Sequence, residues 1–174
     1  MTQQTTRSTE KSLGHWMRAR LPYGLAELVM FVLKQGWAAL FGGLMLVGIM
    51  VTKAIWQPDW TVARYDALVI YAVTLQAAFL YFKLESWAEA RVILLFHMSG
   101  TLMEIFKIHM GSWAYPEPGL LKLMGVPLFS GFMYASVGSF QARVIRIFEM
   151  RFAPYPPLWM SFVLGGAIYV NFFS

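Results

Sequence analysis

Ionisable side chains inside an apolar run are the residues of this sequence best suited to chemistry. The run from Val92 to about Ile108 contains Glu104, with Lys107 three residues and His97 seven residues away. Seven residues make about two helical turns, so His97 and Glu104 share one helix face. A carboxylate at membrane depth can carry a proton, act as an acid or base, or contact a substrate. His97 would then lie beside Glu104 on the path of the proton or the substrate.

A second interpretation of the same residues is purely structural. Glu104 and Lys107 stand at i and i+3, a spacing that lets them neutralise each other on a helix. Lys107 would then extend its ammonium group to water at the outer interface. The sequence leaves both interpretations open.

The segment after this run adds aromatic and polar groups. Trp113 and Tyr115 are typical of residues that anchor a helix at the membrane interface. They could equally roof a polar pocket above Glu104, with His109 and Glu117 at its rim. These residues, together with His97, Lys107 and Tyr134, form the predicted substrate-binding set.

No metal or cofactor site is predicted. His97 and Glu104 stand about 10.5 Å apart along a helix, too far to share one ion. His109 and Glu104 differ by five residues, which places them on different helix faces. The sequence has no cysteine, which excludes thiolate zinc sites, disulfides and cysteine nucleophiles.

Small residues recur in the apolar run Leu123–Phe140. Gly131, Ala135 and Ser139 follow one another at four-residue intervals, a pattern typical of closely packed helices. Ser130 and Tyr134 lie on a neighbouring stripe. We expect Tyr134 to line a pocket that faces the Glu104 run.

Five apolar runs position these residues, and each approaches the roughly 20 residues that a membrane span needs. They are Gln35–Thr52, Ala67–Phe82, Val92–Ile108, Leu123–Phe140 and Leu158–Phe173. An amphipathic stretch, Leu21–Lys34, leads into the first run and is expected to belong largely to the same long helix. Turn signals at residues 57–60, 115–119 and 153–157 separate the runs. The predicted fold is all-α: a polytopic transmembrane helix bundle of about five spans.

The composition agrees with this fold. Apolar residues make up 58% of the sequence and charged residues only 13%, against about 45–50% and about 25% in soluble domains. The net charge is +5, but the basic residues form no stripe or tract, so no nucleic-acid partner is predicted. Membrane lipids are the expected surroundings.

The distribution of Lys and Arg predicts the orientation. Ten of the 14 fall in the N-terminal region and in the loops that lie on the same side of the predicted membrane. Because cytoplasmic loops carry the excess of positive charge, we expect a bacterial inner-membrane protein with a cytoplasmic N-terminus. Arg143, Arg146 and Arg151 are interpreted as part of this topology signal, with contacts to anionic lipid.

The sequence divides at about residue 20. Residues 1–20 are polar and are predicted to form a cytoplasmic tail, either disordered or lying at the membrane interface. Residues 21–174 form the predicted transmembrane domain. The last run stops at Ser174 without a flanking polar segment, and we expect the chain to be the first part of a longer protein.

Three segments together carry a family resemblance. Residues 104–107 (EIFK), 111–117 (GSWAYPE) and 125–134 (GVPLFSGFMY) resemble the bacterial integral membrane family known as domain of unknown function 817. The likeness extends from about Glu27 onward. It implies a longer protein with seven or eight spans, and the family name implies no activity.

A second, weaker resemblance concerns enzymes of carotenoid end-group chemistry. Heterodimer-type lycopene cyclases and carotenoid hydratases have an acidic residue, a Gly-aromatic-x-Tyr loop and a Val-Pro-Leu helix start, in an order similar to Glu104, residues 111–115 and residues 126–128. The resemblance implies that Glu104 would protonate an alkene as a buried acid. The paired acidic residues of the cyclases are absent from this sequence.

Two functions therefore remain open. The first is a transporter or permease that moves a small solute past Glu104, His97 and Lys107. The alternative is a membrane-embedded enzyme that acts on a lipophilic isoprenoid, with Glu104 as the acid and Trp113 and Tyr115 shaping its pocket. The sequence specifies neither the substrate nor the oligomeric state.

Overall fold

The structure is a computed structural model that describes the backbone of residues 3–57 and 59–173 and the side chains of residues 12–57 and 59–171. Pro58, in the predicted turn at residues 57–60, lies outside the described residues. Around it, the N–H of Trp60 donates to the C=O of Gln57 (3.2 Å), as a turn requires.

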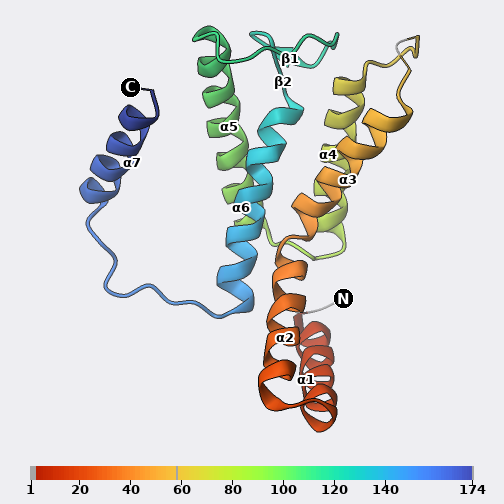
Figure 1. The fold of residues 1–174 in the computed structure, drawn as a ribbon, viewed down its shortest axis with the longest axis vertical. Coiled ribbons are helices and arrows are strands. Elements are labelled where there is room, and N and C mark those ends of the chain that lie inside the picture. Colours follow the sequence, from red (N-terminus) through yellow and green to blue (C-terminus); the bar gives the residue numbers. More distant parts are fainter. Residues whose placement is uncertain (1–2, 58, 174) are drawn as a thin grey trace.

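The described chain is all-helical apart from one short hairpin (Figure 1). In chain order its elements are α1 (Gln3–Arg20), α2 (Tyr23–Ala38), α3 (Leu40–Ile55), α4 (Arg64–Tyr81), α5 (Trp87–His109), β1 (Lys122–Leu123), β2 (Val126–Pro127), α6 (Phe129–Ile147) and α7 (Leu158–Phe173). The all-α prediction is confirmed.

Helices α5 and α6 pack side by side at the centre of the molecule (Figure 1). Helices α3 and α4 lie on one side of this pair, and α3 packs on α4 through Phe41, Met45, Ala72 and Phe79. Helix α7 lies on the other side, joined to α6 by an extended segment. Every described side chain of α7 is exposed.

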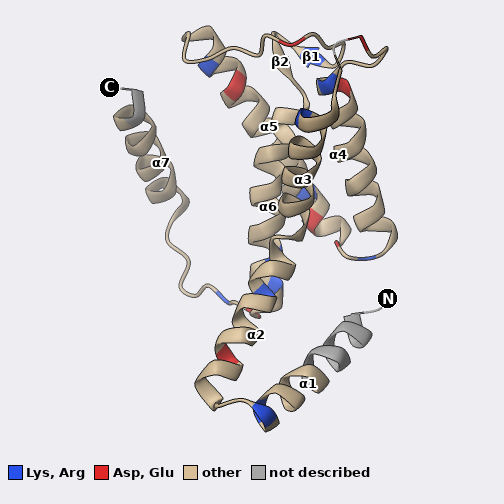
Figure 2. Ribbon diagram, turned by 45° about the vertical axis from the view of Figure 1, so that its right-hand side comes forward, with Lys and Arg blue, Asp and Glu red and all other residues tan. Residues whose placement is uncertain are grey.

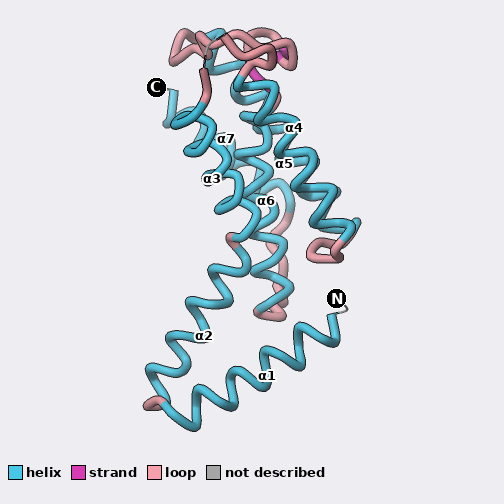
Figure 3. Tube along the Cα trace, turned by 90° about the vertical axis from the view of Figure 1, so that its right-hand side faces the viewer, coloured by secondary structure: helices cyan, strands magenta, loops and turns pink. Residues whose placement is uncertain are grey.

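Within the predicted N-terminal tail, residues 3–20 form helix α1. Helices α1 and α2 meet at one end of the molecule and diverge from there (Figure 3). Met17 of α1 packs with Ala26 and Met30 of α2 in a small buried cluster.

The first predicted span is not one straight helix. Helices α2 and α3 meet at Ala39 with a bend of 62°, so the expectation of a continuous helix from residue 21 through the run Gln35–Thr52 is wrong. The bend lies close to Gly36 and Gly42, and glycines near a break lower the cost of a kink.

The fourth predicted span begins later than its apolar run. Residues 122–127 form the antiparallel hairpin of β1 and β2 instead of helix. Met124 and Gly125 both have positive φ, 49° and 85°, which is the signature of a two-residue type I′ turn. Pro127, at the end of β2, has no N–H to donate inside a helix. Helix α6 starts two residues later, at Phe129.

Helix length and composition support fewer spans than the sequence predicts. Among the helices of the described residues, α5 by itself is long and apolar enough to cross a membrane, and the bent pair α2–α3 would be a second span if counted as one. α7 is apolar but shorter. The five-span prediction is not confirmed, because α4 and α6 have 18 and 19 residues but are not apolar enough, and the break at Ala39 divides the first predicted span.

Close packing of α5 on α6 depends on glycine. A Cβ at Gly100 would overlap the Tyr134 side chain, whereas a Cβ at Gly43 would meet no atom within 4 Å. We expect Gly100→Ala to lower the free energy of unfolding by about 1–3 kcal/mol, the usual cost of overpacking. Gly43→Ala should leave it unchanged or raise it by up to about 1 kcal/mol, because alanine favours helix. Thermal unfolding of the purified variants measures both. Equal midpoints would contradict the close packing.

Candidate functional site

Helix α5 carries the predicted carboxylate and begins at a strong capping signal. Ser86 Oγ accepts the N–H of Glu89 (3.3 Å), and the Glu89 carboxylate accepts the N–H of Ser86 (2.6 Å). This capping box satisfies two backbone groups that the first turn leaves open. The helix then continues for 23 residues, and Glu104 is buried near its other end.

The end of α5 turns the chain back over Glu104. Gly111 has a φ of +72°, and the N–H of Ser112 donates to the C=O of Lys107 (3.0 Å). This arrangement is a Schellman motif, in which glycine takes the left-handed position without a Cβ clash. Residues 110–121, called the roof loop below, start at this turn and return above α5.

Four donors from α5, α6 and the roof loop surround the Glu104 carboxylate. Oε1 accepts hydrogen bonds from Tyr134 OH (2.5 Å) and Lys107 Nζ (3.3 Å). Oε2 accepts hydrogen bonds from Trp113 Nε1 (3.0 Å) and Tyr115 OH (2.9 Å). The structure therefore brings four predicted site residues to Glu104, and we call these five residues the Glu104 cluster.

Helix α4 holds the roof loop in place. Asp66, in the first turn of α4, accepts hydrogen bonds from the N–H groups of Leu120 (2.8 Å) and Leu121 (2.7 Å). Arg64 forms a two-bond fork with Glu117 (2.8 and 2.6 Å), the strong geometry for a guanidinium and a carboxylate. These bonds fix the loop against α4 and so fix the aromatic groups above Glu104.

Tyr115 is the roof residue most enclosed by other aromatic rings. Its ring stands edge-on to Tyr65 (5.9 Å between centroids) and to Phe129 (6.4 Å). Burial, and then the hydrogen bond to Glu104, raise the pKa of its phenol. The hydroxyl therefore stays protonated at neutral pH and remains a donor to the carboxylate.

Three predicted site residues do not contact Glu104. His97 lies on the side of α5 that faces α6, where its ring packs on Phe132 (4.5 Å). His109 is exposed. Glu117 is held by Arg64 and does not form a rim with His109.

Small and polar residues continue along the contact between α5 and α6. Gly131 leaves room for Thr101 and His97, because a Cβ there would overlap both side chains. Among the described residues, His97 Nδ1 and Ser130 Oγ are buried without a hydrogen-bond partner. We call this buried line of small and polar groups, from Glu89 to Glu104 on α5 and the α6 residues opposite, the polar seam.

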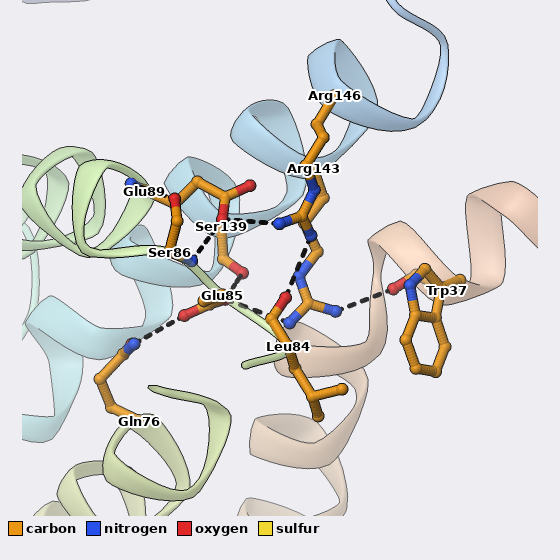
Figure 4. A network of polar contacts seen from close by, with 9 residues as sticks. All are labelled: Trp37, Gln76, Leu84, Glu85, Ser86, Glu89, Ser139, Arg143 and Arg146. Atoms are coloured by element: carbon orange, nitrogen blue, oxygen red, sulfur yellow. Dashed lines mark hydrogen bonds and ion pairs between the residues drawn. The ribbon is translucent and has the colours of Figure 1, made fainter. Parts of the chain in front are cut away.

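A second charged cluster closes the other end of the seam (Figure 4). Glu85 accepts hydrogen bonds from Ser139 Oγ (2.6 Å) and Gln76 Nε2 (2.6 Å), and pairs with Arg143 Nη2 (3.3 Å). Neither side chain of the Glu85–Arg143 pair is exposed. The Arg143 guanidinium also donates to the C=O of Trp37 (3.1 Å), two residues before the break between α2 and α3 at Ala39.

Arg146 and Glu89 extend this second cluster. Arg146 Nη1 donates to the Glu89 carboxylate (2.9 Å) and Nη2 donates to the C=O of Leu84 (3.0 Å). Within the described residues, one buried polar atom on each of Gln76, Glu89 and Arg143 has no partner. We call Gln76, Glu85, Glu89, Ser139, Arg143 and Arg146 the Glu85 cluster. It ties α2, α4, α5 and α6 together.

Sequence reasoning missed the Glu85 cluster. It interpreted Arg143 as a topology signal in a loop, but Arg143 is fully buried, and this interpretation is wrong. The signal was available, because Arg143 continues the stripe of Gly131, Ala135 and Ser139 by four more residues. A residue at that spacing faces the same helix neighbour.

The chemistry open to these clusters is that of charge and hydrogen bonding. Among the described residues no group of three or more His, Cys, Asp or Glu side chains could hold a metal ion. The four contacts to Glu104 all donate to its carboxylate, so a protonated Glu104 would require a tyrosine hydroxyl to reverse its hydrogen bond.

Two pockets are described, and neither touches Glu104. One of about 400 Å³ lies between α1, α2 and the end of α6, and one of about 230 Å³ lies between α3 and α6.

Comparison with known proteins gives a family but no activity. A family model described as a protein of unknown function (DUF817) matches residues 27–174. The uncharacterized protein YoaT of Bacillus subtilis (strain 168) is 39% identical over 150 residues, which are 86% of this chain and 56% of the relative. The chain thus spans little more than half the length of that relative. No solved structure matches this chain significantly.

The Glu85–Arg143 pair should be essential for folding. Arg143→Met leaves the Glu85 carboxylate buried without its cation, and we expect the free energy of unfolding to fall by about 3–5 kcal/mol. The double variant Glu85→Gln, Arg143→Met removes both charges and should recover part of this loss. Arg151→Met, at an exposed position after α6, is the control and should change stability by less than about 0.5 kcal/mol. Chemical denaturation measures all three variants, and a harmless Arg143→Met would refute the role of the pair.

Proposed function

This chain belongs to the DUF817 family, whose description names no activity, and we propose a function from the geometry alone. The protein is a multi-pass membrane transporter that moves a small polar solute along the polar seam between α5 and α6. The observation that carries the proposal is the seam itself. It is a buried line of small and polar groups, interrupted by Ile93 and Phe96, with a charged cluster at each end. The helices that contain it have apolar outer faces.

Exposed apolar side chains support the membrane location. Large apolar residues point outward on every helix of the described chain, among them Leu46, Ile70, Leu102 and Phe162, which are 56–77% exposed. Soluble proteins rarely expose apolar patches of this extent. Lipid tails would cover this surface, and the polar groups would remain inside the bundle, as membrane helices require.

The cost of burying charge supports a functional role for the seam. Ionisable groups at membrane depth are expensive and usually mark a solute or ion path. Glu89 and Glu104 are fifteen residues apart on α5, about 22 Å along the helix axis, so the two clusters stand near opposite sides of a membrane core about 30 Å thick. Each cluster closes one end of the seam in the structure.

The Glu104 cluster is the solute site in this proposal. A solute with hydrogen-bonding groups would replace some of the four donors on Glu104, and Lys107 would supply a compensating charge. Tyr134 would link the site to α6, and Trp113 and Tyr115 would contact the solute from the roof loop. His97 and Ser130, whose buried atoms have no partner in the described chain, would bind the solute or its water further along the seam.

The hydrogen bonds around Glu104 favour transport over the enzyme alternative. An alkene-protonating acid needs a proton on the carboxyl group and an apolar pocket beside it. In this structure every hydrogen bond to Glu104 is donated to its oxygens, which is the pattern of an ionised carboxylate.

The proposed orientation places the Glu85 cluster on the cytoplasmic side of the inner membrane. Lys83, Arg146 and Arg151 lie at that end of the molecule. The excess of basic residues there follows the rule that cytoplasmic loops carry positive charge.

Metabolite profiling of cells that express the full-length gene tests the proposal. Cells with the wild-type protein should show a shift in one soluble metabolite between cytoplasm and medium. Glu104→Gln should abolish this shift, because the neutral amide cannot balance Lys107 or accept all four donors. Asp59→Asn, which removes an exposed carboxylate on the connection from α3 to α4, is the control and should behave as wild type.

The other outcomes discriminate between functions. A lipid that appears or disappears with Glu104 would overturn transport and support an enzyme acting on lipophilic substrates. No change in either pool, at matched protein levels, would leave Glu104 a structural role.

A further inference from the structure

The larger pocket lies outside the polar seam, where α1 meets α2. It has a volume of about 400 Å³ and is partly open to solvent. Its lining comes from α1, α2 and Phe148 at the end of α6. Figure 2 shows basic residues on the end of α1 and on α2, at the same end of the molecule.

The lining of this pocket includes two cationic side chains and one carboxylate. Arg18 of α1 and Lys34 of α2 contribute two cations, and Glu27 contributes one carboxylate. Arg18 Nε is paired with Glu27 (2.7 Å), but both side chains are substantially exposed, 52% and 39%. Exposed pairs of this kind are weak and exchange readily, so a phosphate group can take Glu27's place on Arg18.

The floor of the pocket is apolar. Met30, Phe31 and Phe148 line it, and the two phenylalanine rings pack against each other at 5.8 Å. Gly14 has no side chain to fill the space above them. A soluble anion would leave this floor in contact with water, whereas the glycerol and first methylenes of a lipid would cover it.

The neighbouring side chains are typical of the membrane interface. Trp16 on α1 is 52% exposed, and the Arg20 guanidinium lies 4.6 Å above its ring. Tryptophan and arginine together are characteristic of helices that lie at the headgroup level. The positive excess also places this end on the cytoplasmic leaflet, where anionic lipids attract basic groups.

From the pocket, its charge and its floor, we propose that the cleft between α1 and α2 binds the headgroup of an anionic phospholipid, with Arg18 and Lys34 on the phosphate and Met30, Phe31 and Phe148 under the glycerol. This inference rests on the proposed membrane location but not on transport. Bound lipid would join α1 to α2 and so hold the N-terminal helix at the membrane surface.

Native mass spectrometry of the purified full chain tests the site. The probes are phosphatidylglycerol and phosphatidylcholine with the same acyl chains. We expect a preference for phosphatidylglycerol, reduced about fivefold by each of Arg18→Gln and Lys34→Gln, which corresponds to about 1 kcal/mol per basic residue near an anionic surface. Arg20→Gln, which changes a basic residue of α1 outside the pocket lining, should retain more of the preference than Arg18→Gln.

A second pair of variants tests the cavity without changing charge. Gly14→Leu should fill the pocket and abolish the preference. Gly24→Leu, at a helical glycine with no atom within 4 Å of a Cβ, should retain it. Circular dichroism confirms that both variants are folded.

Three results would overturn the inference. Competition by glycerol phosphate as strong as by the lipid would identify a soluble anion as the ligand. Equal binding of both lipids by a protein that enters vesicles would refute the site and leave the membrane proposal standing. Failure of the wild-type protein to enter phosphatidylglycerol vesicles would refute the membrane location as well.

Discussion

The close contact between α5 and α6 is the constraint on which the rest of the structure depends. Three glycines make it possible, since Gly100 accommodates Tyr134, Gly131 accommodates Thr101 and His97, and Gly138 accommodates Phe96. The short distance brings Glu104 within reach of Tyr134, and Ser139 and Arg143 within reach of Glu85. A charge buried between helices is tolerated only when partners stand this close.

The two clusters at the ends of this contact differ in how completely they are satisfied. Both oxygens of Glu104 have two donors each. The Glu85 cluster has more charges, yet one polar atom on each of Gln76, Glu89 and Arg143 lacks a partner among the described residues. Arg143 also links the Glu85 cluster to the end of α2, just before the break between α2 and α3, through the Trp37 carbonyl.

The roof loop shows how a site can depend on residues far from it in sequence. Asp66 and Arg64 belong to α4, more than fifty residues before the loop segment they hold. Their bonds fix the loop backbone, and the loop in turn presents Trp113 and Tyr115 to Glu104. The geometry around one carboxylate on α5 therefore requires α4, α6 and the loop to be correctly placed together.

The sequence by itself determined the helical class, the position of most helices and the residues that gather around Glu104. Apolar runs, Gly/Pro joints and an acidic residue inside an apolar segment are local patterns, and they predicted α4, α5 and α7 closely. Lys107, Trp113, Tyr115 and Tyr134 were predicted as neighbours of Glu104, and all four contact it.

Only the tertiary structure decided which charges are buried and with which partner. A period of 3.6 residues shows which side chains share a helix face, but not what lies opposite that face. In the sequence, Arg143 thus resembled a cation in a loop, and only the structure shows that it is buried beside Glu85. Glu117 resembled a residue at the rim of the site, and only the structure shows that it pairs with Arg64. The bend at Ala39 and the hairpin before α6 interrupt apolar runs, in which hydropathy alone indicates an unbroken helix. Hydropathy measures burial or lipid contact and not backbone direction, so counting apolar residues along the sequence could not place either break.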